Sequence, residues 1–378
     1  MTERPPQDIL DNPGPPPPQG DGAIGLVPAL LAVLGWYFRS PYGFLQGDRQ
    51  PPFYCDPSRV GGFAVNPGEL AAGHEAALFK LFVALAMFQA LRDVVIMRQQ
   101  QGYSAFSVRV IADPAYIQDS LAGHPCPAFG SVEGFEARCD VSKIAGVVDC
   151  GRCPGVRCQV KEATLVFNRM GDLGKLPTSA WLRLWKPGGL SAVLAEVCDR
   201  EPSPAKRAKL LVERLGQVHR VGRKLATMFV SALSTPSLAP GLTPWFPEVD
   251  GHDLVVVDTN VARAVDALRT CGAKTYQARE NWVREQAAQI DLRRYRADLP
   301  NHSPRLVQQA LYCFGSRSNR VAAGDPCSVR TTPCEGCAPN LCPFVKTIVP
   351  PCRRSRSDLR PPQPPTPLSS KEGVGHRM

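Results

Sequence analysis

Four cysteines near the C-terminus constrain this chain more than any other feature of its sequence. Cys327, Cys334, Cys337 and Cys342 follow the spacing C-x6-C-x2-C-x4-C. Four thiolates this close together can surround one metal centre and make the chain fold around it. One CxxC pair between two longer arms suits a [4Fe–4S] cluster better than zinc, which favours two CxxC pairs. Zinc, or thiols without metal, remain the alternatives.

A second group of cysteines lies in the middle of the chain. Cys150, Cys153 and Cys158 repeat the C-x2-C-x4-C spacing, and Cys139 or Cys126 is available as a fourth ligand. We therefore predict a second metal site, zinc or iron-sulfur, at Cys139, Cys150, Cys153 and Cys158. The alternative is an insertion with free thiols.

The setting predicted for these thiols is reducing. Fourteen cysteines in 378 residues would suggest disulfides in a small secreted domain, but this chain is large and begins without a secretion signal. The apolar run 24–36 contains Pro28 and is too short to span a bilayer. A cytoplasmic protein without a membrane partner is expected.

The formal net charge is +10, and most of it belongs to the body of the chain. Residues 346–378 carry 7 basic and 2 acidic residues, whereas residues 1–22 carry 1 basic and 4 acidic residues. A basic body favours a polyanionic partner, nucleic acid first, although a solvated basic surface is the plainer interpretation.

The chain divides into five segments. Proline-rich tails at 1–22 and 346–378 are expected to be disordered. An N-terminal flank (23–74) precedes a helical region (75–325) that carries a cysteine-rich insertion at 126–158, and a cysteine loop (326–345) follows.

Helical periodicity dominates the central region, and strand signals are few. The run Leu254–Val257 ends at once in Asp258, so we interpret it as a buried connection whose aspartate caps the next helix. A mainly α protein is predicted, with loops at 126–158 and 234–253. The helical segments are 75–101, 205–217, 223–233, 259–269 and 304–314.

A tight turn between two helices carries the first chemical motif. Gly222 in the segment VHRVGRKLA (218–226) is placed where a hairpin needs positive φ or a close backbone approach. The amides that begin the next helix, with Arg223 beside them, are suited to a phosphate. The segment VDTNVAR (257–263) then places Asp258 at a helix start.

The hairpin VGRKLA, then VDTNVAR, then the four-cysteine loop resembles the endonuclease III branch of the helix-hairpin-helix DNA glycosylases, from about residue 75 to 345. The family hairpin usually reads LPGVGRKTA and its acidic motif VDTHV-x-R. The segment 79–93 is similar to the family's early helix, whose final glutamine, here Gln89, enters the gap left by an extruded base. This chain has His219-Arg220 for the usual Pro-Gly, x4 for x5 between the last cysteines, and an enlarged loop at 234–253.

The resemblance implies a two-lobed, mainly α fold and excision of a damaged base, commonly an oxidised pyrimidine, or of a mismatched base. Lys224 would be the nucleophile that forms a Schiff base, with Asp258 supporting it and with Arg220 and Arg223 lowering the lysine pKa. It further implies a monomer on double-stranded DNA with a [4Fe–4S] cluster. The implied DNA contacts are Gln89, Arg220, Val221, Gly222 and Arg223.

Two other functions remain open. One is a helix-hairpin-helix DNA-binding protein that is inactive, or that removes bases without nicking the strand. The other is a zinc-stabilised interaction module that uses both cysteine groups.

Overall fold

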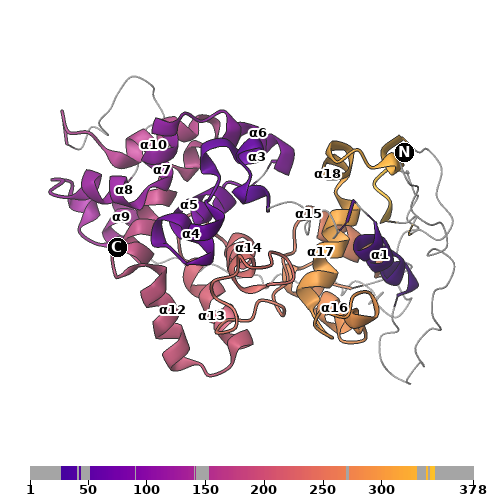
Figure 1. Cartoon of the computed structure of the whole chain (residues 1–378). Coiled ribbons are helices and arrows are strands. Elements are labelled where there is room, and N and C mark those ends of the chain that lie inside the picture. Colours follow the sequence, from indigo (N-terminus) through magenta and orange to yellow (C-terminus); the bar gives the residue numbers. More distant parts are fainter. Residues whose placement is uncertain are drawn as a thin grey trace, which may run out of the picture. The chain divides into compact units, whose positions relative to one another are not determined.

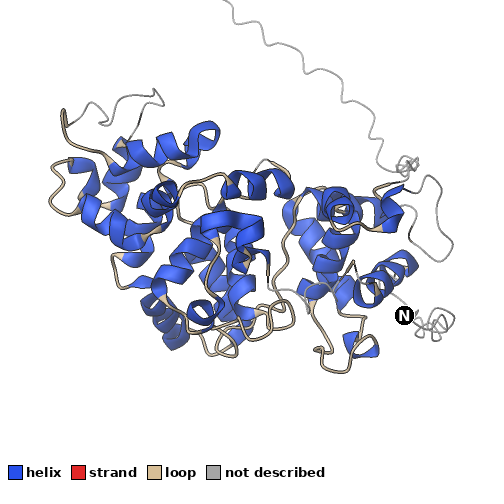
Figure 2. Cartoon of the chain, turned by 45° about the horizontal axis from the view of Figure 1, so that its top comes forward, coloured by secondary structure: helices blue, strands red, loops and turns tan. Residues whose placement is uncertain are grey.

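The computed structural model describes residues 27–40, 42–43, 52–89, 91–139, 141, 153–269, 272–329, 338 and 341–344. These residues form helices and contain no β-strand (Figures 1 and 2). The prediction of a mainly α protein is confirmed. The expectations for residues 1–22 and 346–378, and for Cys150, Cys334 and Cys337, lie outside the described residues.

Most of the described chain consists of short α-helices. They are α1 (Pro28–Arg39), α3 (Pro57–Val60), α4 (Pro67–Ala71), α5 (Glu75–Ala86), α6 (Asp93–Gln101), α7 (Ala105–Ala112), α8 (Pro114–Leu121), α9 (Val132–Arg138), α10 (Gln159–Phe167), α11 (Leu176–Ala180), α12 (Gly189–Arg200), α13 (Pro204–Leu215), α14 (Arg223–Ser234), α15 (Thr259–Leu268), α16 (Tyr276–Ala287), α17 (Pro304–Gly315) and α18 (Arg317–Ala322). Six 3₁₀ turns and one π turn join them: η2 (Phe53–Cys55), η3 (Gly61–Phe63), η4 (Pro127–Phe129), η5 (Asn168–Leu173), η6 (Trp181–Trp185, the π turn), η7 (Leu292–Arg294) and η8 (Pro326–Val329).

Apolar spacing explains why the central helices form. In α14 the buried side chains of Leu225, Phe229 and Leu233 recur every four residues, so they share one face. Asp258 caps α15 and Ser303 caps α17 through side-chain bonds to backbone amides. The sequence-based ranges for these helices agree with the structure.

The segment 75–101 is not one helix, contrary to the prediction. α5 ends at Ala86, and α6 begins only at Asp93. Arg92 has extended backbone angles, φ −72° and ψ 144°. The carbonyl of Phe88 accepts a hydrogen bond from Lys224, so it is occupied by a partner distant in the sequence. The break therefore belongs to the tertiary structure around Lys224.

The described helices bury two large apolar cores. The first includes α5 and α14, whose rings Phe82 and Phe229 meet edge to face at 5.1 Å. The second includes α1, α15, α16 and α17, and α1 lies against α17 (Figure 1). Ala338 and Leu341 of the cysteine loop are buried in this second core, so the loop is anchored to the late helices.

Of the two expected loops, one contains helical turns and the other is packed. Part of the range 126–158 forms η4 and α9. The range 234–253 is irregular, but Trp245 and Val249 are buried in the first core. None of the helices in the described part of the chain has the length and apolar character needed to cross a membrane.

Candidate functional site

One cavity of about 710 Å³ gathers the residues that the sequence singles out for chemistry. Lys224 comes from α14 and Asp258 from the N-terminus of α15. Asp93 of α6 and Arg305 and Tyr312 of α17 line the same space. The walls therefore draw on helices of both cores.

Lys224 occupies the first turn of α14 and is half-buried. Its Nζ donates a 3.2 Å hydrogen bond to the carbonyl of Phe88, in the connection between α5 and α6. This bond fixes the amine at the cavity wall, where a ligand entering the cavity can meet it.

Asp258 caps α15, as its position predicts. Its Oδ1 accepts a 2.8 Å hydrogen bond from the amide of Val261. Burial raises the pKa of Asp258, and the charge of Asp93 raises it further, whereas the Val261 amide and the charge of Lys224 act in the opposite direction. Asp258 is thus electrostatically coupled to Lys224, and its raised pKa suits a group that takes up a proton.

A second carboxylate, which the sequence did not reveal as a site residue, also faces this cavity. Tyr312 donates a short hydrogen bond to Oδ2 of Asp93, and Asn319 donates to the Tyr312 hydroxyl at 2.9 Å. Burial and the neighbouring Asp93 hold the pKa of Tyr312 well above its usual value, so the phenol stays protonated and keeps Asp93 oriented. The signal in the sequence was an aspartate at the start of α6.

The hairpin between α13 and α14 differs from the expectation at one residue. Gly222 has φ −77° and ψ 178°, which any residue adopts, whereas Arg220 has φ +62°. The left-handed position therefore falls on Arg220, where the resembling family has glycine. A Cβ built on Gly222 would meet no atom within 4 Å, so the glycine leaves open space beside the N-terminus of α14.

The other expected DNA contacts are placed unequally. The side chain of Val221 is 1% exposed and belongs to the first core, so only its backbone can touch a ligand. Gln89 is half-buried, adjoins Phe88, and donates its amide to the carbonyl of Ala86 at 2.6 Å. Its side chain must leave that bond to enter a duplex.

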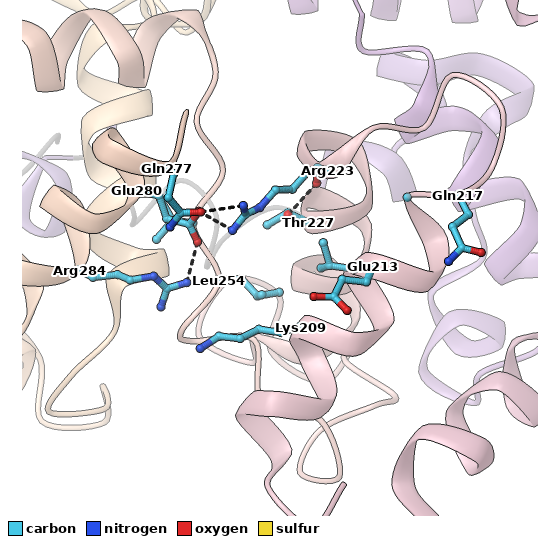
Figure 3. Close-up of a pocket in the computed structure, with 12 residues that line it drawn as sticks. Lys209, Glu213, Gln217, Arg223, Thr227, Leu254, Gln277, Glu280 and Arg284 are labelled. Carbon is cyan, nitrogen blue, oxygen red and sulfur yellow. Dashed lines mark hydrogen bonds and ion pairs between the residues drawn. The ribbon is translucent and has the colours of Figure 1, made fainter. Parts of the chain in front are cut away.

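Arg223 lines a different cavity, of about 560 Å³ (Figure 3). Its Nη2 lies 2.6 Å from Glu280 Oε2, and its Nη1 donates to Gln277 at 2.9 Å. Glu280 also binds Arg284 at 2.9 Å and is buried. The guanidinium is thus paired with α16 and does not supply the positive charge that was expected beside Lys224.

The described part of the cysteine loop is held by a buried ion pair. Arg320 Nε lies 2.6 Å from Asp325 Oδ2, and Asp325 Oδ1 accepts from the amide of Cys327 at 2.9 Å. The guanidinium also lies over the rings of Trp36 and Phe344, at 4.6 and 5.0 Å. These contacts position the first cysteine of the motif.

The metal ligands can be followed only in part. Cys327 and Cys342 are half-buried, and Cys334 and Cys337 lie outside the described residues. Among the residues that are described, no three Cys, His, Asp or Glu side chains form a ready metal-binding group. The thiols that are present are the donors that an iron-sulfur cluster uses.

The second cysteine group forms part of a small third core. Cys126, Cys139 and Cys158 are buried there, with Cys153 at its edge. Cys150 lies outside the described range. Four of the five candidate cysteines therefore lie in or beside one small apolar core.

Comparison with protein-family models, with curated proteins and with solved structures found no match to this chain.

Proposed function

We propose that this protein is a DNA glycosylase with abasic-site lyase activity, which removes a damaged or mismatched base and nicks the strand through a lysine Schiff base. The observation that carries the proposal is the presence of Lys224 and Asp258 in one cavity, electrostatically coupled, at the end of the α13–α14 hairpin. The motif order in the sequence supports the same fold, a two-lobed helix-hairpin-helix glycosylase.

In this mechanism the base leaves the duplex, at a cost of a few kcal/mol, and enters the cavity. Nζ of Lys224 forms a bond to C1′ of the sugar while the glycosidic bond breaks, and the base departs with the electron pair and takes up a proton. Opening of the sugar ring gives the Schiff base. Loss of a proton from C2′ then expels the 3′ phosphate, and water releases Lys224.

Two interactions of Lys224 suit the protein for the first step. The Phe88 carbonyl fixes one N–H of the amine, which leaves the remaining positions of the nitrogen for the cavity. Asp258 is close enough to Lys224 to interact with its charge, so its carboxylate can either take the proton that the amine must lose or, while it is ionised, stabilise positive charge on the sugar.

The DNA surface and the cofactor follow from the same arrangement. Double-stranded DNA would lie on the hairpin, with the amides of Gly222 and Arg223 toward a phosphate and Gln89 toward the gap in the duplex. Cys327, Cys334, Cys337 and Cys342 would hold a [4Fe–4S] cluster, which supplies a structural anchor for the loop. We propose a monomer that works on DNA in the cytoplasm.

Borohydride trapping tests the function. Anaerobically purified protein is incubated with duplexes that carry an abasic site, an oxidised pyrimidine or a mismatched uracil, with and without borohydride. Reduction of the Schiff base should give a covalent adduct on the abasic duplex. Lys224→Ala should abolish the adduct, and Lys206→Ala, which changes an exposed lysine of α13, should not.

The same samples distinguish the alternatives. Tight DNA binding without adduct or nicking would show a non-catalytic or monofunctional member of the fold. A colourless protein that contains zinc and no iron would contradict the cluster and favour the interaction module.

A further inference from the structure

Helix α17 presents a polar face to the active-site cavity. Its apolar side chains, Leu306, Val307, Ala310, Leu311 and Phe314, belong to the second core. Arg305, Gln308, Gln309 and Tyr312 line the cavity instead, and their spacing of three and four residues places them on one side of the helix. α17 therefore buries its apolar side chains in the second core and presents these hydrogen-bonding side chains to the cavity.

Arg305 is buried without a carboxylate partner among the described residues. Its side chain is 8% exposed. Nε donates to Ser231 at 2.5 Å, and Nη1 donates to Gln308 at 2.6 Å and Gln309 at 2.8 Å. All three acceptors are neutral, and burial lowers the pKa of Arg305 to about 10. Such a charge is costly to bury, and the described residues offset that cost only with neutral hydrogen-bond acceptors.

The second terminal nitrogen of this guanidinium remains unused. No residue that the structure describes accepts a hydrogen bond from Nη2, whereas Nε and Nη1 are both engaged. Since those bonds hold the planar group in place, the direction of Nη2 is fixed before any ligand arrives.

Gln308 supplies a second donor beside it. Its Oε1 accepts from Arg305 Nη1 and from the amide of Val256, the latter at 3.2 Å. Because two donors point at this atom, it must be the amide oxygen, and the orientation of the Gln308 amide is determined. The amide nitrogen, Nε2, then has no acceptor in the described part of the chain. The cavity wall therefore offers two preset donors, Arg305 Nη2 and Gln308 Nε2.

The depth of this wall indicates what it meets. Lys224, which must reach the sugar, is half-buried, whereas Gln308 is 2% exposed. In the proposed mechanism the base would lie beyond the sugar, deeper in the cavity, and a hydrated phosphate would stay outside. Phe53, Leu85 and Phe88 line the same cavity and provide apolar surface for a flat ring.

We propose that Arg305 and Gln308 recognise the carbonyl oxygens of an extruded base, so that the substrates are uracil, thymine and their oxidised derivatives in preference to amino-bearing bases. The inference rests on the proposed function. A pyrimidine-2,4-dione offers two carbonyl acceptors, whereas cytosine places an amino donor at one of these positions. The amino group of cytosine would face a donor of the protein, and both groups would be left without an acceptor. A buried site strongly disfavours binding of such a base.

Binding and trapping with Arg305→Met and Gln308→Met test this role. The duplexes carry 5-hydroxyuracil, 5-hydroxycytosine, a base-less tetrahydrofuran site or a natural abasic site. Wild-type protein should bind the 5-hydroxyuracil duplex more tightly than the other lesions. Arg305→Met should weaken that binding by about 10- to 100-fold, the worth of one charged hydrogen bond. Binding to the base-less duplex and adduct formation on the abasic duplex should stay within about threefold of wild type, a margin well below the loss of one such bond.

Arg294→Met, at an exposed position of η7, is the matched control and should change nothing. Equal losses on the base-less and the 5-hydroxyuracil duplexes would show that Arg305 only joins α17 to α14, and would overturn the proposal. An unchanged preference for 5-hydroxyuracil would overturn it as well. If wild-type protein forms no adduct on the abasic duplex, the proposed chemistry fails. The ratio of the binding constants for the 5-hydroxyuracil duplex and the base-less duplex still decides the role of Arg305 and Gln308.

Discussion

Arg220 holds the left-handed backbone position of the hairpin, with φ +62°. A side chain with a Cβ costs roughly 1 kcal/mol in this region, a cost that glycine avoids. Arg220→Gly and Arg220→Ala both remove the side chain and its interactions. They differ in that cost and in the larger entropy of glycine in the unfolded chain, which offsets part of it. We therefore expect the glycine variant to be more stable than the alanine variant by up to about 1 kcal/mol.

Urea denaturation of the two Arg220 variants measures this difference. Equal stabilities, or a more stable alanine variant, would mean that residue 220 does not hold the left-handed conformation in solution.

Asp258 illustrates a conflict between stability and chemistry. Because burial raises its pKa above the ordinary 3.8, the folded state binds the proton more tightly than the unfolded state. The bound proton therefore stabilises the folded state. This stabilisation is complete below pH 3.8 and is lost as the pH rises through the pKa of Asp258 in the folded state, so the ionised carboxylate destabilises the fold at pH 7. Asp258→Asn keeps a capping oxygen and removes the charge.

We expect Asp258→Asn to unfold at higher denaturant concentration than wild type at pH 7, with a gap that narrows toward pH 4. The trapped adduct should fall by on the order of 100-fold. Lower stability of the asparagine variant at pH 7 would show that attraction to Lys224 outweighs the cost of burial.

At the scale of elements, local patterns predicted some of the helices and missed others, such as α7, α10 and α12, as well as the interruption after Ala86. α13, α14, α15 and α17 were predicted because their apolar residues recur with helical spacing. The break after Ala86 was not, since it depends on a hydrogen bond between Phe88 and Lys224, 136 residues apart. The highly polar α16 gave too weak an apolar pattern to be recognised, although its Trp282 and Val283 are buried in the second core.

The cysteine groups carry a prediction at the same scale. Four thiols of the insertion meet in or beside the third core, and the loop after α18 begins with Cys327 held by Asp325. Since the two groups are anchored in separate cores, we expect independent metal sites. Cys158→Ser should remove one zinc per chain without loss of iron, and Cys327→Ser should remove iron without loss of zinc.

Elemental analysis of the purified variants, with Cys198→Ser as control, measures both metals. If wild-type protein contains no zinc, the cysteines of the insertion bind no zinc, and the buried ones act as small apolar residues of the third core.

For the molecule as a whole, the sequence identified the two proposed catalytic residues but not the residues that line the cavity around them. Lys224 and Asp258 belong to contiguous motifs, so a resemblance could identify them. Asp93 and Tyr312 are 219 residues apart, and Arg305 meets Ser231 across 74 residues. No local pattern encodes such contacts, and they form only when the helices of both cores contribute to one cavity.

Charge is the property that acts over the whole molecule, and it predicts how DNA binding responds to salt. A net charge of +10 favours association with a polyanion, and each phosphate that a cation neutralises adds close to one unit to the log–log dependence of affinity on salt. If Arg220 contacts a phosphate in place of the usual hairpin glycine, Arg220→Ala and Arg220→Gly should each lower the magnitude of that slope by about 1.

Titration of undamaged duplex at several salt concentrations measures the slope, with Arg294→Met as control for the loss of one surface charge. An equal decrease in the control would assign the effect to the overall field, and no decrease in either hairpin variant would remove Arg220 from the DNA contact.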